Sequence, residues 1–117
     1  MFLSLRTLVY HAPDLVAARA FYVKLTGQEP YFEAPYYIGF DINGFELGLD
    51  PDVAHVKVGN NQVAYWKVAS IASTLDWSLQ CGALLEQPAT QVGEGTLVAQ
   101  VIDPWGNYIG LIEEATL

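Results

Sequence analysis

The sequence predicts an α+β fold of two β-α-β-β-β units, which form a curved, partly open sheet barrel around a cleft. The order strand, helix, strand, strand, strand occurs twice along the 117 residues. The helix starts at Asp14 and Ser70 and the helix ends at Gly27 and Gly82 repeat at nearly the same interval. Each helix covers one face of its sheet, so we expect the two uncovered faces to enclose the cleft.

The first unit is expected over about residues 5–50. A β-rich run at residues 7–11 precedes Asp14, which is a suitable N-cap for a helix. Apolar residues then recur at helical spacing up to Gly27, which predicts a helix over residues 14–26. Three strands should follow, over residues 29–33, 36–42 and 45–49.

The Asn43-Gly44 pair predicts a two-residue hairpin turn between the last two of these strands. Such a turn fixes the cross-strand partners as Ile42 with Phe45, Asp41 with Glu46, Phe40 with Leu47, and Gly39 with Gly48. The helix-covered face should then carry apolar side chains, namely Phe40, Ile42, Phe45, Leu47 and Leu49.

The second unit is expected over about residues 62–114. Residues 63–68 predict a strand, and Ser70 is a suitable N-cap for a helix that ends at Gly82. Further strands are predicted near residues 83–87, 97–102 and 108–112. The segment Asp103-Pro104-Trp105-Gly106-Asn107 joins the last two and predicts a type I turn with a bulge at its glycine.

Composition and charge restrict the function. Hydrophobic residues make up 52% of the chain and charged residues 15%, which indicates a single domain over residues 1–117. The net charge of −8 repels phosphate backbones and anionic lipids, so we expect neither nucleic-acid nor membrane partners. The first residues lack the features of a signal peptide, and we expect a cytoplasmic protein. The single cysteine excludes an internal disulfide.

Taken together, these features resemble the vicinal oxygen chelate superfamily. This superfamily includes glyoxalase I, extradiol dioxygenases, fosfomycin-resistance enzymes and bleomycin-resistance binding proteins. The resemblance rests on the doubled unit, on Asp14-Leu15 followed by Phe21-Tyr22, and on the turn at residues 103–107. It covers roughly residues 5–114 and implies the fold predicted above.

The resemblance also implies where a metal would be bound. Metal-dependent members carry a ligand in the first strand and another in the last strand of each unit, usually His and Glu. The matching positions of this chain are Thr7, Gly48, Val63 and Gly110, none of which supplies a usable side-chain ligand. We therefore predict no metal and no other cofactor, in the manner of the metal-free bleomycin-resistance-like members.

Strand alternation predicts which side chains face the cleft. They combine tyrosines, carboxylates, a lysine and an amide, and Trp105 joins them from the turn. For His11 a hydrogen bond to the backbone at the strand end is an equal alternative to a role in the cleft, and for the acidic face the alternative is plain solvation. We assign no catalytic residue. The predicted ligand-binding residues are His11, Tyr37, Asp41, Glu46, Tyr65, Lys67, Gln100, Trp105 and Tyr108.

Such a cleft favours an organic ligand with an aromatic ring or a cationic group, held by stacking and charge attraction. The predicted function is metal-independent binding of such a molecule, resembling bleomycin-resistance-like sequestration, by a homodimer. One alternative is a divergent glyoxalase-type or dioxygenase-type lyase or oxidoreductase that binds a divalent metal through His11 and Glu46 in shifted positions. A second alternative is a non-catalytic module that binds a partner protein.

Overall fold

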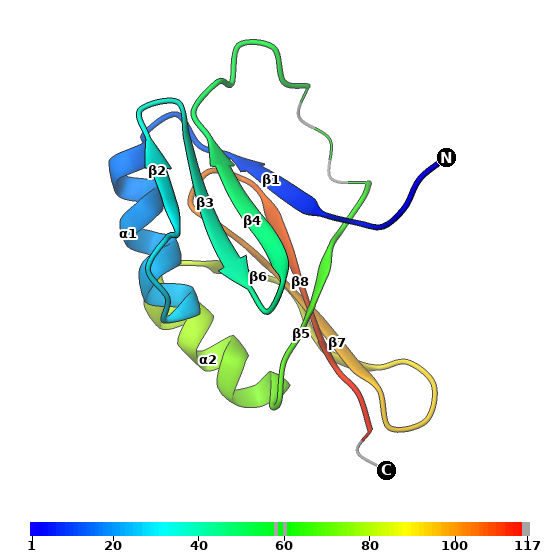
Figure 1. The fold of residues 1–117 in the computed structure, drawn as a ribbon. Coiled ribbons are helices and arrows are strands. Elements are labelled where there is room, and N and C mark those ends of the chain that lie inside the picture. The colour runs from blue at the N-terminus through cyan, green and yellow to red at the C-terminus, as the bar shows by residue number, and fades with distance from the viewer. Residues whose placement is uncertain (58, 60, 116–117) are drawn as a thin grey trace. The chain divides into compact units, whose positions relative to one another are not determined.

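Two β-α-β-β-β units follow one another along the chain, at Met1–Lys57 and Val58–Leu117. The computed structural model describes residues 1–57, 59 and 61–115 (Figure 1). Within these residues each unit contains one helix and a four-stranded mixed sheet, which confirms the predicted fold class. The enclosure of a cleft by the two uncovered faces stays a prediction.

The first unit contains one helix, α1 (Leu15–Thr26), and one sheet with the strand order β1-β4-β3-β2. Strand β1 runs parallel to β4, and the other neighbours are antiparallel. The hairpin register is the predicted one, with Asp41 opposite Glu46 and Gly39 opposite Gly48. The strands are β1 (Thr7–His11), β2 (Phe32–Ala34), β3 (Tyr37–Ile42) and β4 (Phe45–Asp50).

Helix α1 forms where its capping residues predict it. The Asp14 carboxylate accepts a hydrogen bond of 3.1 Å from the amide of Ala17, and Gly27 ends the helix in the left-handed conformation. The helix packs on β3 and β4, and the ring of Tyr22 stacks on that of Tyr10 at 5.7 Å. The core of this unit consists of buried apolar residues, chiefly Tyr10, Ala18, Phe21, Tyr22, Phe40, Leu47 and Leu49.

Two details of the first unit differ from the prediction. Phe45, expected under the helix, is 51% exposed, because it directly follows the hairpin turn, where a side chain has few neighbours. Strand β2 begins at Phe32 and not at Glu29, since Pro30 lacks the amide hydrogen that a strand residue donates. Backbone pairing still reaches the residue before β2, where the amide of Tyr31 donates to the carbonyl of Gly39 at 2.9 Å.

The second unit contains α2 (Ile71–Cys81) and a sheet with the strand order β5-β8-β7-β6. Strand β5 runs parallel to β8, and the other neighbours are antiparallel. Helix α2 packs on β6, β7 and β8. The strands are β5 (Tyr65–Lys67), β6 (Leu84–Gln91), β7 (Leu97–Ile102) and β8 (Tyr108–Glu113).

Helix α2 begins and ends as predicted, and it has a further capping partner. The Ser70 hydroxyl accepts a hydrogen bond from the amide of Ser73, and Gly82 ends the helix in the left-handed conformation. In addition, the Glu113 carboxylate accepts a 2.7 Å hydrogen bond from the amide of Ile71, which places a negative charge at the helix N-terminus. The buried apolar residues of this unit include Ile71, Ala99, Val101, Ile109 and Leu111.

Two strands of the second unit differ in length from the prediction. Strand β5 is shorter than residues 63–68, although Ala64 and Val68 each still make one backbone hydrogen bond to β8. Strand β6 continues to Gln91, past Pro88. Because β6 is an edge strand and its pairing with β7 shifts register twice, Pro88 is accommodated without a missing donor in the ladder.

The turn between β7 and β8 has the predicted form. The amide of Gly106 donates to the carbonyl of Asp103 at 3.1 Å, and Gly106 adopts a φ of 90°. Asp103 is 2% exposed, and its carboxylate accepts hydrogen bonds from the amides of Trp105 and Asn107 and from the side chain of Asn107. The buried carboxylate thus fixes the turn that aligns the last two strands.

Neither helix within the described residues is both long and apolar enough to cross a membrane.

Candidate functional site

The sheet face opposite α1, which we call face 1, carries two glycines side by side, Gly39 and Gly48. The aromatic ring of Tyr37 lies over Gly48. A Cβ atom at Gly48 would lie 2.6 Å from Cζ and 2.9 Å from Cε1 of that ring, and closer still to its hydroxyl. The ring of Tyr31 covers Gly39 less tightly: a Cβ atom at Gly39 would lie 3.2 Å from its Cε1. Both glycines are therefore places where a tyrosine lies directly on the backbone.

Both tyrosines direct their hydroxyls to Glu46. The Tyr37 hydroxyl donates to Oε2 of Glu46 at 2.5 Å, and the Tyr31 hydroxyl donates to Oε1. The Thr7 hydroxyl donates to Oε2 at 3.2 Å, and the guanidinium of Arg6 lies 3.3 Å from the same oxygen. Because Glu46 is only 8% exposed, these four partners replace the water that would otherwise solvate its charge.

At Glu46 this network does not match the alternative of plain solvation that the sequence left open for the acidic face. Sequence alternation placed Tyr37 and Glu46 on one face but did not identify Tyr31 or Arg6. Arg6 lies one residue before β1. Tyr31 falls inside the strand predicted over residues 29–33, but β2 begins only at Phe32, so alternation along the predicted strand gives no reliable direction for it. The other predicted acid, Asp41, is exposed opposite Glu46 and accepts a 2.8 Å hydrogen bond from the amide of Gly44.

Burial raises the pKa of the Tyr37 phenol above its usual value, with a smaller contribution from the Asp50 carboxylate and an opposing one from Arg6. Tyr37 therefore keeps its proton at neutral pH and acts as the hydrogen-bond donor to Glu46. The buried carboxylate and the protonated phenol form one donor and acceptor pair on face 1.

A small pocket opens beside this network at the hairpin end of face 1. Its volume is about 210 Å³, and it is lined by Arg6, Tyr31, Asp41, Gly44, Phe45 and Glu46. It thus brings two of the predicted site residues, Asp41 and Glu46, together with Tyr31 and Arg6, which the sequence did not indicate.

The sheet face opposite α2, which we call face 2, repeats the tyrosine over glycine arrangement. A Cβ atom at Gly110 would lie 2.7 Å from Cδ1 of Tyr65 and 2.7 Å from the carbonyl of Ala64. The Tyr65 hydroxyl accepts a 2.9 Å hydrogen bond from the side chain of Gln100, which lies opposite Gly110 in the sheet. The structure therefore brings the predicted residues Tyr65 and Gln100 together.

The remaining predicted residues of the second unit lie near its strand ends. Lys67 is exposed at the end of β5, opposite Ile112. The Tyr108 hydroxyl donates to Glu86 at 3.2 Å, and the charge of Glu86 raises the pKa of the Tyr108 phenol. Trp105 is half-buried in the turn, with its amide bonded to Asp103.

His11 makes a backbone contact of the kind that the sequence offered as one of two roles for it. Its Nδ1 lies 3.1 Å from the carbonyl oxygen of Asp52, and it stands opposite Asp50 in the pairing of β1 with β4. Glu46 stands opposite Thr7 in the same pairing, four positions away. At about 3.3 Å per residue, this separates His11 and Glu46 by roughly 13 Å along the strands. The two residues are too far apart to ligate one ion.

The donor set does not fit the metal site that the family resemblance implies. Of the four matching positions, the two glycines are covered by tyrosine rings, and Thr7 directs its hydroxyl to Glu46. The fourth, Val63, is apolar. Among the described residues, no three His, Cys, Asp or Glu side chains gather as metal ligands would. We therefore derive no metal-dependent step for this chain.

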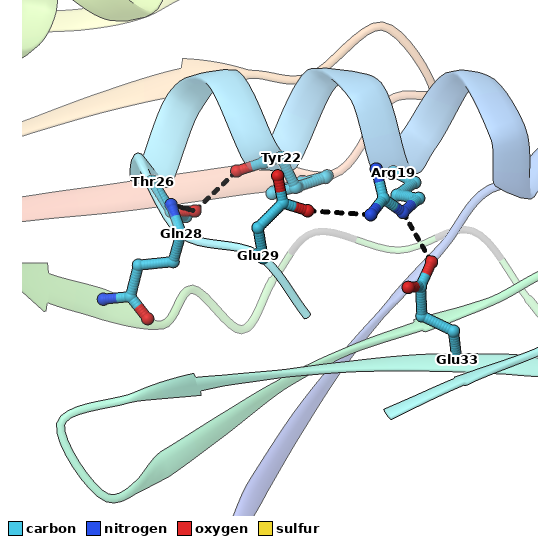
Figure 2. Close-up of polar contacts among 6 residues, drawn as sticks. All are labelled: Arg19, Tyr22, Thr26, Gln28, Glu29 and Glu33. Atoms are coloured by element: carbon cyan, nitrogen blue, oxygen red, sulfur yellow. Dashed lines mark hydrogen bonds and ion pairs between the residues drawn. The ribbon is translucent and has the colours of Figure 1, made fainter. Parts of the chain in front are cut away.

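A larger depression lies between the start of α1 and the β2 strand, with a volume of about 660 Å³. None of the predicted site residues lines it. Arg19 at its margin bonds to Glu33 at 2.5 Å and to Glu29 at 2.7 Å, so its charge is already paired (Figure 2). The hydrogen bond to Glu33 raises the pKa of Arg19 further above its usual value.

Comparison with solved structures identifies the fold. A glyoxalase/bleomycin resistance protein/dioxygenase family enzyme from Burkholderia phytofirmans PsJN superposes with a TM-score of 0.80 at 17% identity, over 95% of this chain and 98% of that one. A glyoxalase-related enzyme from Fulvimarina pelagi superposes with a TM-score of 0.79 at 22% identity, over 97% and 89%. The chain has the fold of these proteins.

A lactoylglutathione lyase from Agrobacterium tumefaciens shares this fold with a TM-score of 0.71 at 21% identity, over 94% of this chain and 92% of that one. No protein-family model and no curated protein matches the sequence. At these identities the likeness establishes the fold, and the function has to be argued from the site.

Proposed function

We propose that this chain is a member of the glyoxalase/bleomycin resistance/dioxygenase superfamily that binds a small organic molecule without the superfamily's metal site. The observation that carries the proposal is that tyrosines lie over Gly48 and Gly110, where the resemblance places metal ligands. Each tyrosine hydroxyl is bonded to a polar side chain, Glu46 or Gln100. Faces 1 and 2 therefore offer aromatic rings with fixed polar groups.

The chemistry of these faces favours a ligand that carries an aromatic ring or a positive charge. Tyr31 and Tyr65 are 59% and 42% exposed, so their rings can stack on a ligand. The net charge of −8 attracts cations to the whole molecule. One cation–π contact contributes about 0.5–2 kcal/mol, so useful affinity requires several such contacts.

A thermal-shift screen followed by calorimetry tests this proposal. The panel consists of cationic aromatic compounds, their neutral isosteres, and zinc, nickel, manganese and iron(II) salts. We expect at least one cationic aromatic compound to raise the melting temperature in a saturable way in the presence of a chelator. A panel in which no organic compound binds contradicts the proposal.

We further propose that the protein acts as a homodimer, as the resemblance to bleomycin-resistance-like proteins implies. Large exposed apolar side chains support this, including Val16 at 82%, Tyr36 at 68% and Leu84 at 67% exposure. Light scattering coupled to size-exclusion chromatography should give twice the chain mass of 12.9 kDa. A monomer at all accessible concentrations overturns this part of the proposal.

A further inference from the structure

The 210 Å³ pocket on face 1 is small for a ligand site. Pockets for drug-sized ligands span about 300–1,000 Å³. A volume of 210 Å³ accommodates one head group of a molecule, with the remainder lying outside. The chemistry of its six lining residues therefore indicates which head group fits.

Two of the lining residues, on neighbouring strands, carry carboxylates. Asp41 and Glu46 are direct cross-strand partners in β3 and β4. Like charges in such positions repel each other, and a cation between them relieves the repulsion. Arg6 places its guanidinium beside Glu46, and one guanidinium against two carboxylates gives the lining a formal charge of −1.

Arg6 is held loosely in this position. Its guanidinium donates to the Thr7 hydroxyl at 2.7 Å and lies 3.3 Å from Glu46, yet its side chain is 75% exposed. The Glu46 end of this ion pair is buried, but the Arg6 end lies largely in solvent, where its charge is screened. The guanidinium of Arg6 therefore occupies the pocket without being fixed there.

Two aromatic rings complete the pocket wall. Tyr31 is 59% exposed and Phe45 is 51% exposed, although both line the pocket. Exposed aromatic faces beside carboxylates favour a flat or compact cation, through charge attraction and cation–π contact. Phe45, which the sequence predicted to lie under the helix, therefore lines the pocket with an exposed ring.

We propose that this pocket binds the guanidinium or primary ammonium head of the ligand, and that Arg6 is an internal competitor that occupies it when no ligand is bound. The inference rests on the proposed ligand-binding function and assigns its charge-recognition site. A bound head group replaces Arg6 beside Glu46 and reaches Asp41 across the strand pair. Displaced Arg6 returns to solvent.

Calorimetric titration with benzylguanidine, and with benzylurea as its neutral isostere, tests this inference on the full chain. We expect benzylguanidine to bind about tenfold more tightly than benzylurea. Arg6→Gln removes the competing guanidinium and should tighten benzylguanidine binding about threefold or more. The gain is modest because the Arg6–Glu46 ion pair that the ligand has to displace is weak. Asp41→Asn should weaken it about fivefold.

Matched controls keep the test specific. Asp41→Asn retains an oxygen for the amide of Gly44, so the hairpin turn is preserved. Asp50→Asn removes a carboxylate elsewhere on β4 and likewise keeps an oxygen for the amide of Asp52. Arg19→Gln removes an arginine of the same unit that does not line the pocket. The Asp50→Asn and Arg19→Gln controls should leave benzylguanidine affinity within about twofold, because neither residue lines the pocket.

The outcomes separate the two proposals. Equal binding of the two probes, no effect of Asp41→Asn, or weaker binding by Arg6→Gln overturns the head-group pocket while ligand binding stands. If benzylguanidine does not bind but another compound of the panel does, the head-group pocket is likewise overturned and the proposed ligand binding stands. If no organic compound of the panel binds, the proposed function fails and the head-group pocket fails with it.

Discussion

The ring of Tyr37 lies against the backbone of Gly48, so that a Cβ atom at residue 48 would be 2.6 Å from its Cζ. Real Cβ atoms do not approach another heavy atom this closely. The glycine and the tyrosine are consequently one structural unit, in which the missing side chain makes room for the ring that bonds to Glu46.

Gly48→Ala should destabilise the protein by about 1–3 kcal/mol, because the added methyl group displaces Tyr37 and its hydrogen bond. Urea unfolding measures this change. Gly59→Ala is the control, since a Cβ atom there would meet, of the residues that the structure describes, Asn61 alone, at 3.8 Å. In a Tyr37→Ala background, Gly48→Ala should lower the free energy of unfolding much less. If the effects of the two substitutions on this free energy simply add, the two residues do not interact.

The raised pKa of Tyr37 predicts a loss of stability at alkaline pH. The folded chain holds this proton more tightly than the unfolded chain does, because burial disfavours the phenolate. The stabilisation from this protonated phenol is fully present below the pKa of tyrosine in the unfolded chain, about 10, and is lost as the pH rises through the pKa of Tyr37 in the folded chain. Unfolding free energies between pH 8 and pH 11.5 should fall less steeply for Tyr37→Phe than for the unmodified protein. Identical slopes would contradict this assignment.

Asp103→Ala should destabilise the protein by about 3 kcal/mol, since three donors lose a buried charged acceptor. Asp103→Asn should cost less, because the amides of Trp105 and Asn107 share one oxygen, which asparagine retains. Asp14→Ala, which removes an exposed helix cap, should cost about 1 kcal/mol. Equal losses of unfolding free energy for Asp14→Ala and Asp103→Ala would show that the buried carboxylate of the turn stabilises the protein no more than an exposed helix cap does.

Metal removal should leave the protein unchanged. The positions that match metal ligands in the family carry Thr7, Gly48, Val63 and Gly110, which offer no suitable donor set. Dialysis against a chelator should therefore not lower the melting temperature, and readdition of divalent metals should not raise it. A chelator-induced fall that zinc or nickel reverses would require ligands elsewhere in the chain.

Local signals made most of the fold predictable. Asn43-Gly44 fixes its own hairpin register, and the turn from Asp103 to Asn107 is determined by its proline, glycine and capping aspartate. The helix caps at Asp14 and Ser70 depend on hydrogen bonds to residues only three positions away. Elements that depend on neighbouring residues can be derived from a sequence without knowledge of the tertiary structure.

The candidate site was only partly predictable, because it depends on where long side chains end. Alternation placed Tyr37 and Glu46 on one face, yet it gave no indication that Tyr31 would reach Glu46 from outside β2. It also gave no indication that four side chains would surround Glu46 and leave it only 8% exposed. Strand parity gives the direction of a Cβ atom, but the position of a tyrosine hydroxyl depends on the space that a glycine leaves on another strand.

The most direct test of the central claim is calorimetric titration of chelator-treated protein with cationic aromatic compounds, followed by the same titration after readdition of zinc or nickel. We predict saturable binding by the chelator-treated protein, with an affinity that the added metal does not change. Binding that appears only after metal is restored would contradict the claim that tyrosines at Gly48 and Gly110 have replaced the metal site.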